Sequence, residues 1–459
     1  MSDSRRVMVI GGGLAGITAA LDCAAAGAEV TLLEVRRRLG GAAYSFERDG
    51  LEMDNGQHVF LRCCTAYRAL LRRLGSDHLV SVQPRLSIPV LKPGSRTVTL
   101  ARGPLPAPLQ LAGALARYPH LTPLQRLGAA RAAFGLMRLD PSDPALDRVT
   151  LGEWLADHGQ GADAVHALWD LIALPTLNIP AAQASLALGA FVFRTGMLSG
   201  ADAGDIGFHR GTLSQIIGDP AERALRDAGV EVRLGWAAER LTRTAAGYEV
   251  NARGGADGVS AEAAIVAVGH TRAGALLEDL LGDRARVLAG LGSSPIVNLH
   301  VVYDREVCSH QFAAGVGTPV QYLFDRSAAA GAPAGCQYLA VSLSGAEREM
   351  SMSVNELREL YGPALRELLP RARRARVESF LVTREHAATF RSAPGVGALR
   401  PGPLTSQPGI FLAGSWTDTG WPATLEGAVL SGHAAADRAL RDLDGGRGRD
   451  AARPWELTR

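Results

Sequence analysis

"RVMVIGGGLAGITAALDCAAAGAEVTLLE", residues 6–34, is the stretch that decides the fold. It begins with a β-branched apolar run and continues through a glycine turn into an alanine-rich helical pattern. Gly27 is typical of a helix end, and a second buried apolar run then ends at Glu34. This order of elements predicts a βαβ unit at the start of the chain.

The glycine turn has the spacing of a dinucleotide site. Gly11, Gly13 and Gly16 satisfy G-x-G-x-x-G between strand and helix. Without side chains they permit a tight turn, a close approach of the backbone to a pyrophosphate, and close helix packing. The helix N-terminus adds free N–H groups and the positive end of its dipole. The alternative is a glycine-rich turn that binds nothing.

The acid that ends the second strand supports the dinucleotide interpretation. Glu34 follows Gly16 by eighteen residues, where a carboxylate accepts hydrogen bonds from both ribose hydroxyls of an adenosine. A 2′-phosphate would be repelled by this carboxylate. The pattern therefore disfavours NADP at this site.

The next segment, "EVRRRLGGAAYSF", suggests a longer cofactor than NAD. After the acid it adds guanidinium and glycine positions at Arg36, Arg38, Gly40 and Gly41. This pattern resembles the amine oxidase and carotenoid desaturase superfamily of FAD proteins. Those proteins continue with Arg after the glycine pair, whereas this chain has Ala42, so one phosphate contact is missing.

A segment near the C-terminus, "AGSWTDTGWPATLEGAVLSG" (413–432), resembles the superfamily element that returns to the first βαβ unit. The resemblance implies that the start of the final helix points at the flavin pyrimidine and stabilises negative charge on reduced flavin. The superfamily usually has an acid after "AG" that contacts the ribityl chain. Here the position is Ser415, whose hydroxyl would make a weaker hydrogen bond.

Four stretches resemble a narrower family, the squalene-associated FAD-dependent desaturases, understood as hydroxysqualene dehydroxylases. They are "DNGQHVFLRCCTAYRALLRRLG" (54–75), "TLGEWLADHGQ" (150–160), "LWDLIALPTLNIPAAQAS" (168–185) and 413–432. The resemblance spans most of the chain in order. It implies reductive removal of the hydroxyl of hydroxysqualene, in hopanoid-type biosynthesis, by hydride from reduced FAD.

The resemblance also implies positions for the site. Asp54, Gln57 and His58 are the catalytic candidates, with His58 favoured as proton donor because an ordinary imidazole titrates near neutral pH. The alternatives are that Asp418 or Glu426 near the flavin loop is the donor, although Glu426 is expected to cap or orient its helix, or that His58 only hydrogen-bonds the backbone or the flavin. Besides the glycines and Glu34 of the first unit, the expected FAD-binding positions are Arg36, Arg38, Gly40, Gly41, Gly56, Val232, Gly414, Ser415, Trp421, Pro422, Ala423, Thr424 and Glu426.

The predicted fold class is α/β, with a Rossmann-like FAD-binding domain of the GR2 type interleaved with a mixed helical and antiparallel-sheet substrate domain. The FAD-binding domain is assigned to 1–90, 205–290 and 395–441, and the substrate domain to 91–204 and 291–394. A disordered tail is expected over 442–459, because "DLDGGRGRD" is polar and glycine-rich.

The substrate domain should supply an apolar tunnel for a C30 isoprenoid, with Phe191, Phe193 and Met197 as candidate walls. Such lipids partition into bilayers, so the tunnel mouth should lie at an apolar surface patch in peripheral contact with a membrane. The uncharged stretch 171–193 is long enough to span a bilayer, but prolines and polar residues interrupt it. We expect it to be buried.

Composition excludes several other classes. With a net charge of +2, 20% charged residues and both signs scattered, the chain shows no basic stripe, so nucleic acid is not an expected partner. Five cysteines without framework spacing and no secretion signal indicate a reducing compartment, the cytoplasm or the inner membrane face. Single histidines such as His209, His270 and His300 lack ligand spacing, so no metal is expected.

Three other functions stay open at this stage. A carotenoid- or phytoene-type desaturase would move hydride in the opposite direction, and a prenyl-lipid carrier would have no chemistry. An amine oxidase is disfavoured, because aromatic residues make up only 5% of the chain and Lys92 is its only lysine. The electron donor for the flavin is open among NADPH, ferredoxin and free reduced flavin, since the sequence has one dinucleotide fingerprint.

Overall fold

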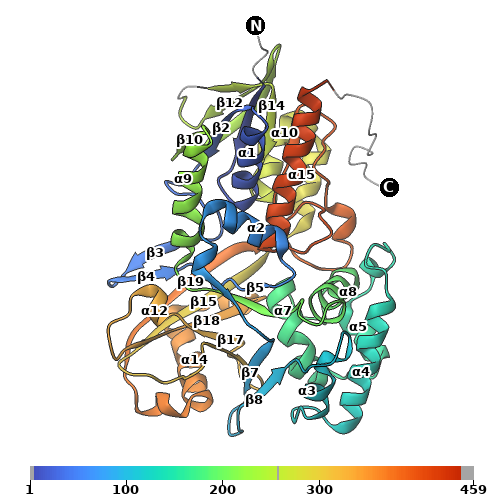
Figure 1. The fold of residues 1–459 in the computed structure, drawn as a ribbon, viewed down its shortest axis with the longest axis vertical. Coiled ribbons are helices and arrows are strands. Elements are labelled where there is room, and N and C mark those ends of the chain that lie inside the picture. The colour runs from blue at the N-terminus through green and yellow to red at the C-terminus, as the bar shows by residue number, and fades with distance from the viewer. Residues whose placement is uncertain (1–4, 256–257, 446–459) are drawn as a thin grey trace.

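The structure is a computed structural model that describes residues 5–255 and 258–445. Its upper part in Figure 1 is built around a sheet of five parallel strands. In sheet order these are β10 (Glu231–Leu234), β2 (Glu29–Glu34), β1 (Arg6–Ile10), β14 (Ala263–Val266) and β20 (Ile410–Leu412). The central strands are buried on both faces, which explains their continuous apolar sequences.

The predicted βαβ unit of residues 6–34 is confirmed. Helix α1 (Leu14–Ala25) joins β1 to β2, and the two strands pair in parallel. The chain leaves the helix through Gly27, whose φ of +81° lies in the left-handed region that glycine adopts without strain. The glycine turn therefore lies at the carboxyl end of β1, directly before the first turn of α1.

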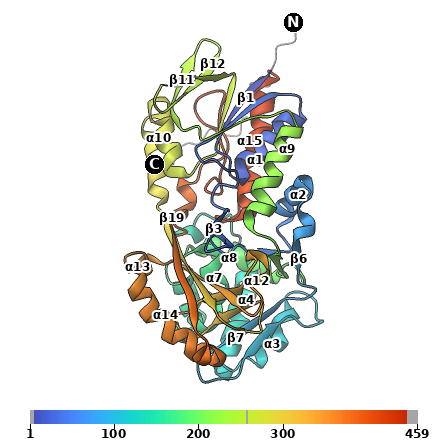
Figure 2. The same ribbon diagram turned by 90° about the vertical axis from the view of Figure 1, so that its left-hand side faces the viewer.

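Both faces of this sheet are covered, as Figure 2 shows. On one side α1 packs with α2 (Thr65–Leu74), α9 (Asp219–Asp227) and α15 (Leu425–Leu443). The other side carries α10 (His270–Leu281), α11 (Asp283–Val287) and an antiparallel sheet of β11 (Ala238–Thr244), β12 (Gly247–Ala252) and β13 (Val259–Ala261).

The two ends of the described chain pack against each other, as predicted. Strand β20 pairs in parallel with β14, and α15 lies along α1 (Figure 1). At the closest point a Cβ atom at Gly432 would lie 2.4 Å from the carbonyl oxygen of Ala15. Only glycine permits this approach, so the C-terminal helix can lie directly on the helix that follows the glycine turn.

The lower part of Figure 1 holds a seven-stranded mixed sheet and a group of helices. The strands in order are β19 (Val377–Thr389), β15 (Ser294–Tyr303), β18 (Gln337–Ser344), β17 (Tyr322–Asp325), β16 (Phe312–Gly315), β7 (Ser87–Leu91) and β8 (Val98–Ala101). One face packs against α14 (Val354–Leu368). The helices, called the helical lobe below, are α3 (Ala112–Ala116), α4 (Pro123–Arg138), α5 (Leu151–Asp157), α7 (Asp170–Leu177) and α8 (Leu186–Phe193).

Two small sheets lie where the upper and lower parts meet. One pairs β3 (Ser45–Arg48) with β4 (Leu51–Asp54), and the other has the order β5 (Phe60–Leu61), β9 (Ile206–His209) and β6 (Val80–Val82). Both belong to the segments that cross between the two predicted domains. They bring the "DNGQH" motif and residues 205–215 together.

The predicted domain boundaries differ from the structure at two places. Strand β7 begins at Ser87 and pairs with β16, so the first segment of the FAD-binding domain ends before residue 87 instead of at 90. Helix α15 continues to Leu443, two residues into the predicted tail, because its apolar face still packs against the core of the parallel-sheet domain. Asp444 and Gly445 follow as a turn, and the rest of that prediction, 446–459, lies outside the described residues.

The long uncharged stretch 171–193 forms parts of two short buried helices, α7 and α8. Between them Asn178 adopts φ +54°, and Ser185 caps α8 by accepting a hydrogen bond from the N–H of Leu188. In the described ranges, no helix combines the length and the apolar character needed to cross a bilayer. Thr150 and Glu153 form a capping box at the start of α5.

Candidate functional site

The glycine turn forms a cradle that other residues would fill. Gly11 has φ +116°, and a Cβ atom there would lie 2.5 Å from the Ala267 carbonyl oxygen. At Gly16 a Cβ atom would lie 1.8 Å from the carbonyl oxygen of Gly11. Helix α1 has Gly13 as its N-cap, with no side-chain cap and no acid in its first turn. Its first N–H groups are therefore left for an anion outside the helix.

A second glycine pair faces this cradle. Gly40 and Gly41 have φ values of +103° and +61°, and a Cβ atom at Gly41 would lie 2.8 Å from the Cα atom of Gly13. Arg38 donates to the carbonyl oxygen of Gly41 and stacks 3.5 Å over the ring of Tyr44. Burial lowers the pKa of Arg38. The predicted positions 38, 40 and 41 thus lie together beside the turn, whereas Arg36 and Ala42 are exposed.

Glu34 lies at the carboxyl end of β2 beside the cradle. One of its carboxylate oxygens accepts a hydrogen bond from the N–H of Gly12 (2.6 Å) and the other from the N–H of Arg36 (2.8 Å). The side chain is buried, and these bonds fix both oxygens at the glycine turn. This is the position that an adenosine ribose would need. The predicted neighbour Val232 lies inside β10 opposite Leu32, and Trp236 is the residue of that segment whose N–H reaches the carbonyl oxygen of Glu34.

The C-terminal loop is held by backbone contacts on both sides. The N–H of Gly414 donates to the hydroxyl of Ser431 in α15, and the indole of Trp416 donates to the carbonyl oxygen of Val268 (2.8 Å both). Thr424 caps α15 by accepting from the N–H of Gly427. The predicted positions Ser415, Trp421, Ala423 and Thr424 are half-buried, and Pro422 is buried.

Arg400 is a residue of this loop region that sequence reasoning missed. Its guanidinium is buried, and one nitrogen donates to the carbonyl oxygens of Thr417 and Trp421, both at 2.6 Å. It also lies over the ring of Phe390. Burial lowers its pKa, and the carboxylates of Asp418 and Asp147 oppose that shift. No sequence signal marks it, because an arginine before a proline in a loop is usually exposed.

Glu426 has a different place from the cofactor contact expected for it. Its buried carboxylate accepts from the N–H groups of Ala66 (2.9 Å) and Tyr67 (2.7 Å), at the first turn of α2. Burial raises the pKa of Glu426, and these backbone donors oppose the shift. The N-cap of α2, Cys64, makes no capping bond of its own. Glu426 therefore caps a neighbouring helix and joins α15 to α2.

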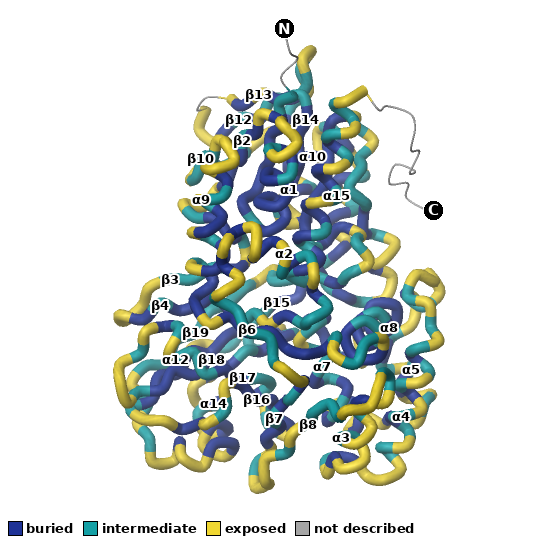
Figure 3. Tube along the Cα trace, viewed as in Figure 1, coloured by how far each residue is buried: buried dark blue, intermediate teal, exposed yellow. Residues whose placement is uncertain are grey.

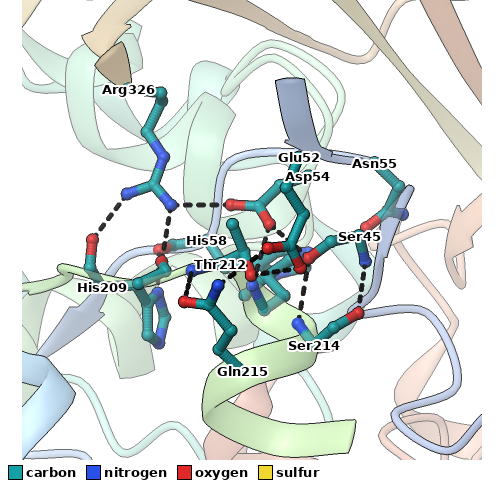
Figure 4. Close-up of polar contacts among 12 residues, drawn as sticks. Ser45, Glu52, Asp54, Asn55, His58, His209, Thr212, Ser214, Gln215 and Arg326 are labelled. Carbon is teal, nitrogen blue, oxygen red and sulfur yellow. Dashed lines mark hydrogen bonds and ion pairs between the residues drawn. The ribbon is translucent and has the colours of Figure 1, made fainter. Parts of the chain in front are cut away.

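The "DNGQH" segment begins in a network of buried polar groups, drawn in Figure 4. Asp54 accepts hydrogen bonds from Ser45 Oγ (2.7 Å), the N–H of Leu213 (2.8 Å) and the guanidinium of Arg326 (2.8 Å). Burial raises its pKa, and the positive charge of Arg326 opposes this. These hydrogen bonds to both carboxylate oxygens hold the segment in place through Asp54.

Strands β15 and β19 hold the next residues from the other side. The Asn55 carbonyl oxygen accepts from Asn298 Nδ2 (3.0 Å) and Thr383 Oγ1 (2.8 Å), and Asn55 Nδ2 donates to Glu385 (2.9 Å). Gly56 is buried against Asn298, where a Cβ atom would lie 3.2 Å from the amide nitrogen. The loop that follows is thus fixed between the two predicted domains.

Gln57 and His58 follow this fixed point. The Gln57 side-chain nitrogen is buried and has no hydrogen-bond partner within residues 5–255 and 258–445. A buried amide without a partner is costly, so its orientation fits a ligand acceptor at that point. It is the strongest sign in this segment that a polar ligand completes the site.

His58 does not have the ordinary pKa assumed from the sequence. Burial lowers its pKa to about 4, with the charge of Glu385 acting in the other direction. Its carbonyl oxygen accepts from Nδ1 of His209, whose Nε2 is 2.7 Å from the hydroxyl of Tyr67. Both imidazoles are therefore neutral at pH 7. A neutral His58 can donate or accept a hydrogen bond, but it carries no extra proton.

An apolar cavity of about 150 Å³ lies in the helical lobe. Its walls come from β7, β8, α3, α4, α7, α8 and the residues next to them, and all twenty lining residues are apolar. Phe193 and Met197, two of the predicted walls, line it. The third, Phe191, instead makes an edge-to-face contact with Trp421 of the C-terminal loop, at 5.2 Å between ring centroids. Helix α8 thus connects the cavity to the loop beside the cradle.

Comparisons with known proteins agree with this arrangement. Residues 14–440 match the family described as flavin containing amine oxidoreductase. A hydroxysqualene dehydroxylase from Rhodopseudomonas palustris is 30% identical over 446 residues, covering 95% of this chain and 99% of that protein. A zeta-carotene desaturase from Zea mays is 26% identical and covers 93% of this chain and 82% of its own.

Solved structures show the same fold. A cyclohexylamine oxidase from Brevibacterium oxydans superposes with a TM-score of 0.73 at 18% identity, over 96% of this chain and 99% of that one. At this identity the likeness concerns the fold alone. It agrees with the predicted interleaving of a parallel-sheet domain with a mixed-sheet domain.

Proposed function

The chain belongs to the flavin containing amine oxidoreductase family and, within it, to the hydroxysqualene dehydroxylases, and we propose that it converts hydroxysqualene to squalene. It is an FAD-dependent oxidoreductase. The observation that carries the proposed substrate is the likeness to named hydroxysqualene dehydroxylases over nearly the whole chain. The wholly apolar cavity supports it, because a C30 isoprenoid alcohol is hydrocarbon over nearly all of its length.

The residues of this chain fit FAD. The uncapped start of α1 suits the pyrophosphate, and the doubly hydrogen-bonded Glu34 suits the adenosine ribose. The unpartnered nitrogen of Gln57 is a donor for an acceptor on the cofactor or on the substrate. Arg400 keeps the C-terminal loop beside the cradle through two carbonyl oxygens.

The reaction replaces a hydroxyl group by hydrogen. The C–O bond of the allylic alcohol breaks, the hydroxyl takes a proton that comes from solvent by way of the His58 imidazole and leaves as water, and a C–H bond forms at the same carbon. Bound FAD in its reduced form supplies the two electrons and the hydrogen as hydride. An external donor must then reduce FAD again, and we place the reaction in hopanoid-type biosynthesis, where squalene is consumed.

The chain's own residues prepare the hydroxyl for departure. In the proposal His58 hydrogen-bonds the hydroxyl as a neutral imidazole, and Gln57 donates a second hydrogen bond. Asp54 is a positioning residue, because its carboxylate joins β4 to Arg326 and Leu213. The apolar cavity would bind the hydrocarbon part of the substrate away from water.

An anaerobic single turnover tests the proposed function. The purified protein is loaded with FAD, photoreduced and mixed with hydroxysqualene, and we expect flavin reoxidation together with about one squalene per flavin. A His58→Gln variant should keep the flavin spectrum and turn over about a hundredfold more slowly. The exposed His386→Gln is the matched control.

One rival function is favoured by a specific observation, the likeness to zeta-carotene desaturases. A desaturase removes hydride from its substrate, so oxidised FAD would bleach on addition of phytoene or zeta-carotene. Bleaching by a carotene, with no reoxidation of reduced flavin by hydroxysqualene, would replace the proposal by this rival.

A further inference from the structure

The charged residues are less evenly scattered than the overall composition suggests. From residue 78 to residue 139 the chain has no Asp or Glu. The same stretch contains eight basic residues, namely Arg85, Lys92, Arg96, Arg102, Arg117, Arg126, Arg131 and Arg138. Since the whole chain has a net charge of +2, the remainder has six more acidic than basic residues. The positive charge is therefore concentrated in one segment.

This segment folds at the end of the molecule farthest from the N-terminus, over β7, β8, α3 and α4 (Figure 1). Arg102 is paired with Asp205, and Arg126 donates to backbone carbonyl oxygens. The other six basic side chains are exposed and have no carboxylate partner among the residues that the structure describes. Their charges face solvent.

Large apolar side chains are exposed at the same place. Nine such side chains are exposed in the described parts of the chain, and five of them lie between residues 105 and 134. They are Leu105, Leu109, Leu124, Leu127 and Phe134, with Leu124 79% exposed and Leu127 61% exposed. In Figure 3 much of α3 and α4 is coloured as exposed.

The exposed apolar residues and the arginines share one surface of α4. Residues 124, 127, 131, 134 and 138 follow one another at intervals of three or four, so they lie along one face of that helix. We call this surface, with Leu105, Leu109 and Arg117, the α4 face. Leu109 and Phe134 also line the apolar cavity, so the α4 face lies directly outside its wall.

We propose that the α4 face docks on a bilayer that contains anionic phospholipids. Exposed leucines and a phenylalanine would enter the boundary between headgroups and acyl chains, and unpaired arginines beside them would meet lipid phosphates. Basic side chains spread over several elements of a stretch that contains no Asp or Glu match a broad negative surface better than a small acidic partner. The contact is peripheral, because no helix in the described ranges can cross a bilayer.

This docking places the cavity wall against the lipid phase. A water-insoluble ligand could then pass between bilayer and cavity past Leu109 and Phe134 without crossing water. The inference rests on the surface alone and not on the proposed reaction.

Co-sedimentation with vesicles tests it, using the full chain loaded with FAD and no substrate. We expect binding to vesicles of phosphatidylcholine mixed with phosphatidylglycerol, weaker binding to phosphatidylcholine alone, and a loss of binding as salt increases. The double variants Leu124→Ser/Leu127→Ser and Arg117→Glu/Arg131→Glu should each lower binding about tenfold or more.

Matched controls separate docking from general charge and folding effects. Arg72→Glu/Arg223→Glu makes the same change in net charge on exposed arginines of α2 and α9, and Val354→Ser removes an exposed apolar side chain from α14. Both should bind like the parent. Equal loss in test and control variants, or no binding of the parent to the anionic vesicles, overturns the proposal.

The outcome is independent of the reaction. If the proposed function holds, the parent and the docking variants should turn over detergent-dispersed hydroxysqualene at the same rate. If none of them turns it over, the result of the vesicle-binding experiment still stands. If the parent ignores vesicles but sediments as a dimer that Leu124→Ser/Leu127→Ser dissociates, the α4 face is an interface between two copies and the membrane proposal is wrong.

Discussion

The cofactor end of the molecule and the helical lobe are specified in different ways. At the cofactor end, backbone atoms approach so closely that single glycines are required, as at Gly16 and Gly432, and buried charges have defined partners. The lobe also has such an approach at Gly152, but the side chains around its cavity are all apolar, and their total volume matters more than the identity of any one. At the cofactor end a single added methyl group should therefore disrupt the structure, whereas the cavity wall should tolerate most changes of side-chain shape.

Gly16→Ala should have the largest effect. Its Cβ atom would lie 1.8 Å from the Gly11 carbonyl oxygen, so α1 must move away from β1. We expect the free energy of unfolding to fall by about 3 kcal/mol and FAD binding to be lost. Denaturant titration and flavin absorbance measure both. Gly161→Ala in the lobe is the control, because a Cβ atom there meets nothing within 4 Å. An equal fall in the free energy of unfolding for this variant would contradict the special demand for glycine at position 16.

Acid should destabilise the region where the two parts meet. Burial lowers the pKa values of His58 and His300 to about 4 and that of His209 to about 3. These values lie below the ordinary 6.5, so between pH 6.5 and 4 the unfolded chain binds more protons, and stability falls as the pH falls through that window. Urea titrations at several pH values should show a loss on the order of a few kcal/mol.

A single substitution isolates the contribution of one histidine to this pH dependence of stability. His300→Asn should flatten the dependence of unfolding free energy on pH, since His300 is buried between Tyr338 and Thr383. His386→Asn, at an exposed position, should leave it unchanged. A parent protein whose stability is constant from pH 6.5 to 4 would contradict the burial of neutral imidazoles.

Glu34→Gln should weaken FAD binding with a smaller effect on the fold. The amide nitrogen of Gln would face the N–H of Gly12 or of Arg36, both of which are donors. We expect the Kd for FAD to rise about tenfold to a hundredfold, or roughly 1.4 to 2.7 kcal/mol. Glu29→Gln, at the exposed start of the same strand, is the control. Equal Kd values for the two variants would remove Glu34 from the cofactor site.

Ala133→Phe should have the smallest effect on the molecule as a whole. It adds a ring to the wall of the cavity of about 150 Å³ and touches none of the polar network. FAD binding should be unchanged, and KM for the C30 substrate should rise several-fold. Ala289→Phe, at an exposed position, should leave KM as it is. An unchanged KM for Ala133→Phe would mean that the substrate lies elsewhere.

Local patterns predicted the parts of the site that depend on neighbouring residues. The turn at Gly11 to Gly16 needs only a strand directly before it and a helix directly after it. The role of Glu426 could not be found in this way, because its partners Ala66 and Tyr67 lie about 360 residues away. Arg400 was missed for the same reason, since the carbonyl oxygens it binds are exposed by a loop that only the folded chain forms.

By itself the sequence determined the βαβ unit and the dinucleotide cradle, since glycine spacing and apolar periodicity act over a few residues, whereas the return of the C-terminal segment was implied by the resemblance to the superfamily. Tertiary structure decided which polar groups have partners. It neutralised His58 and tied Asp54 to Arg326, and among the described residues it left the nitrogen of Gln57 without a hydrogen-bond partner and the arginines of the α4 face without a carboxylate partner. The physical reason is that burial and charge pairing depend on which distant residues approach, and a linear pattern contains no distances between them.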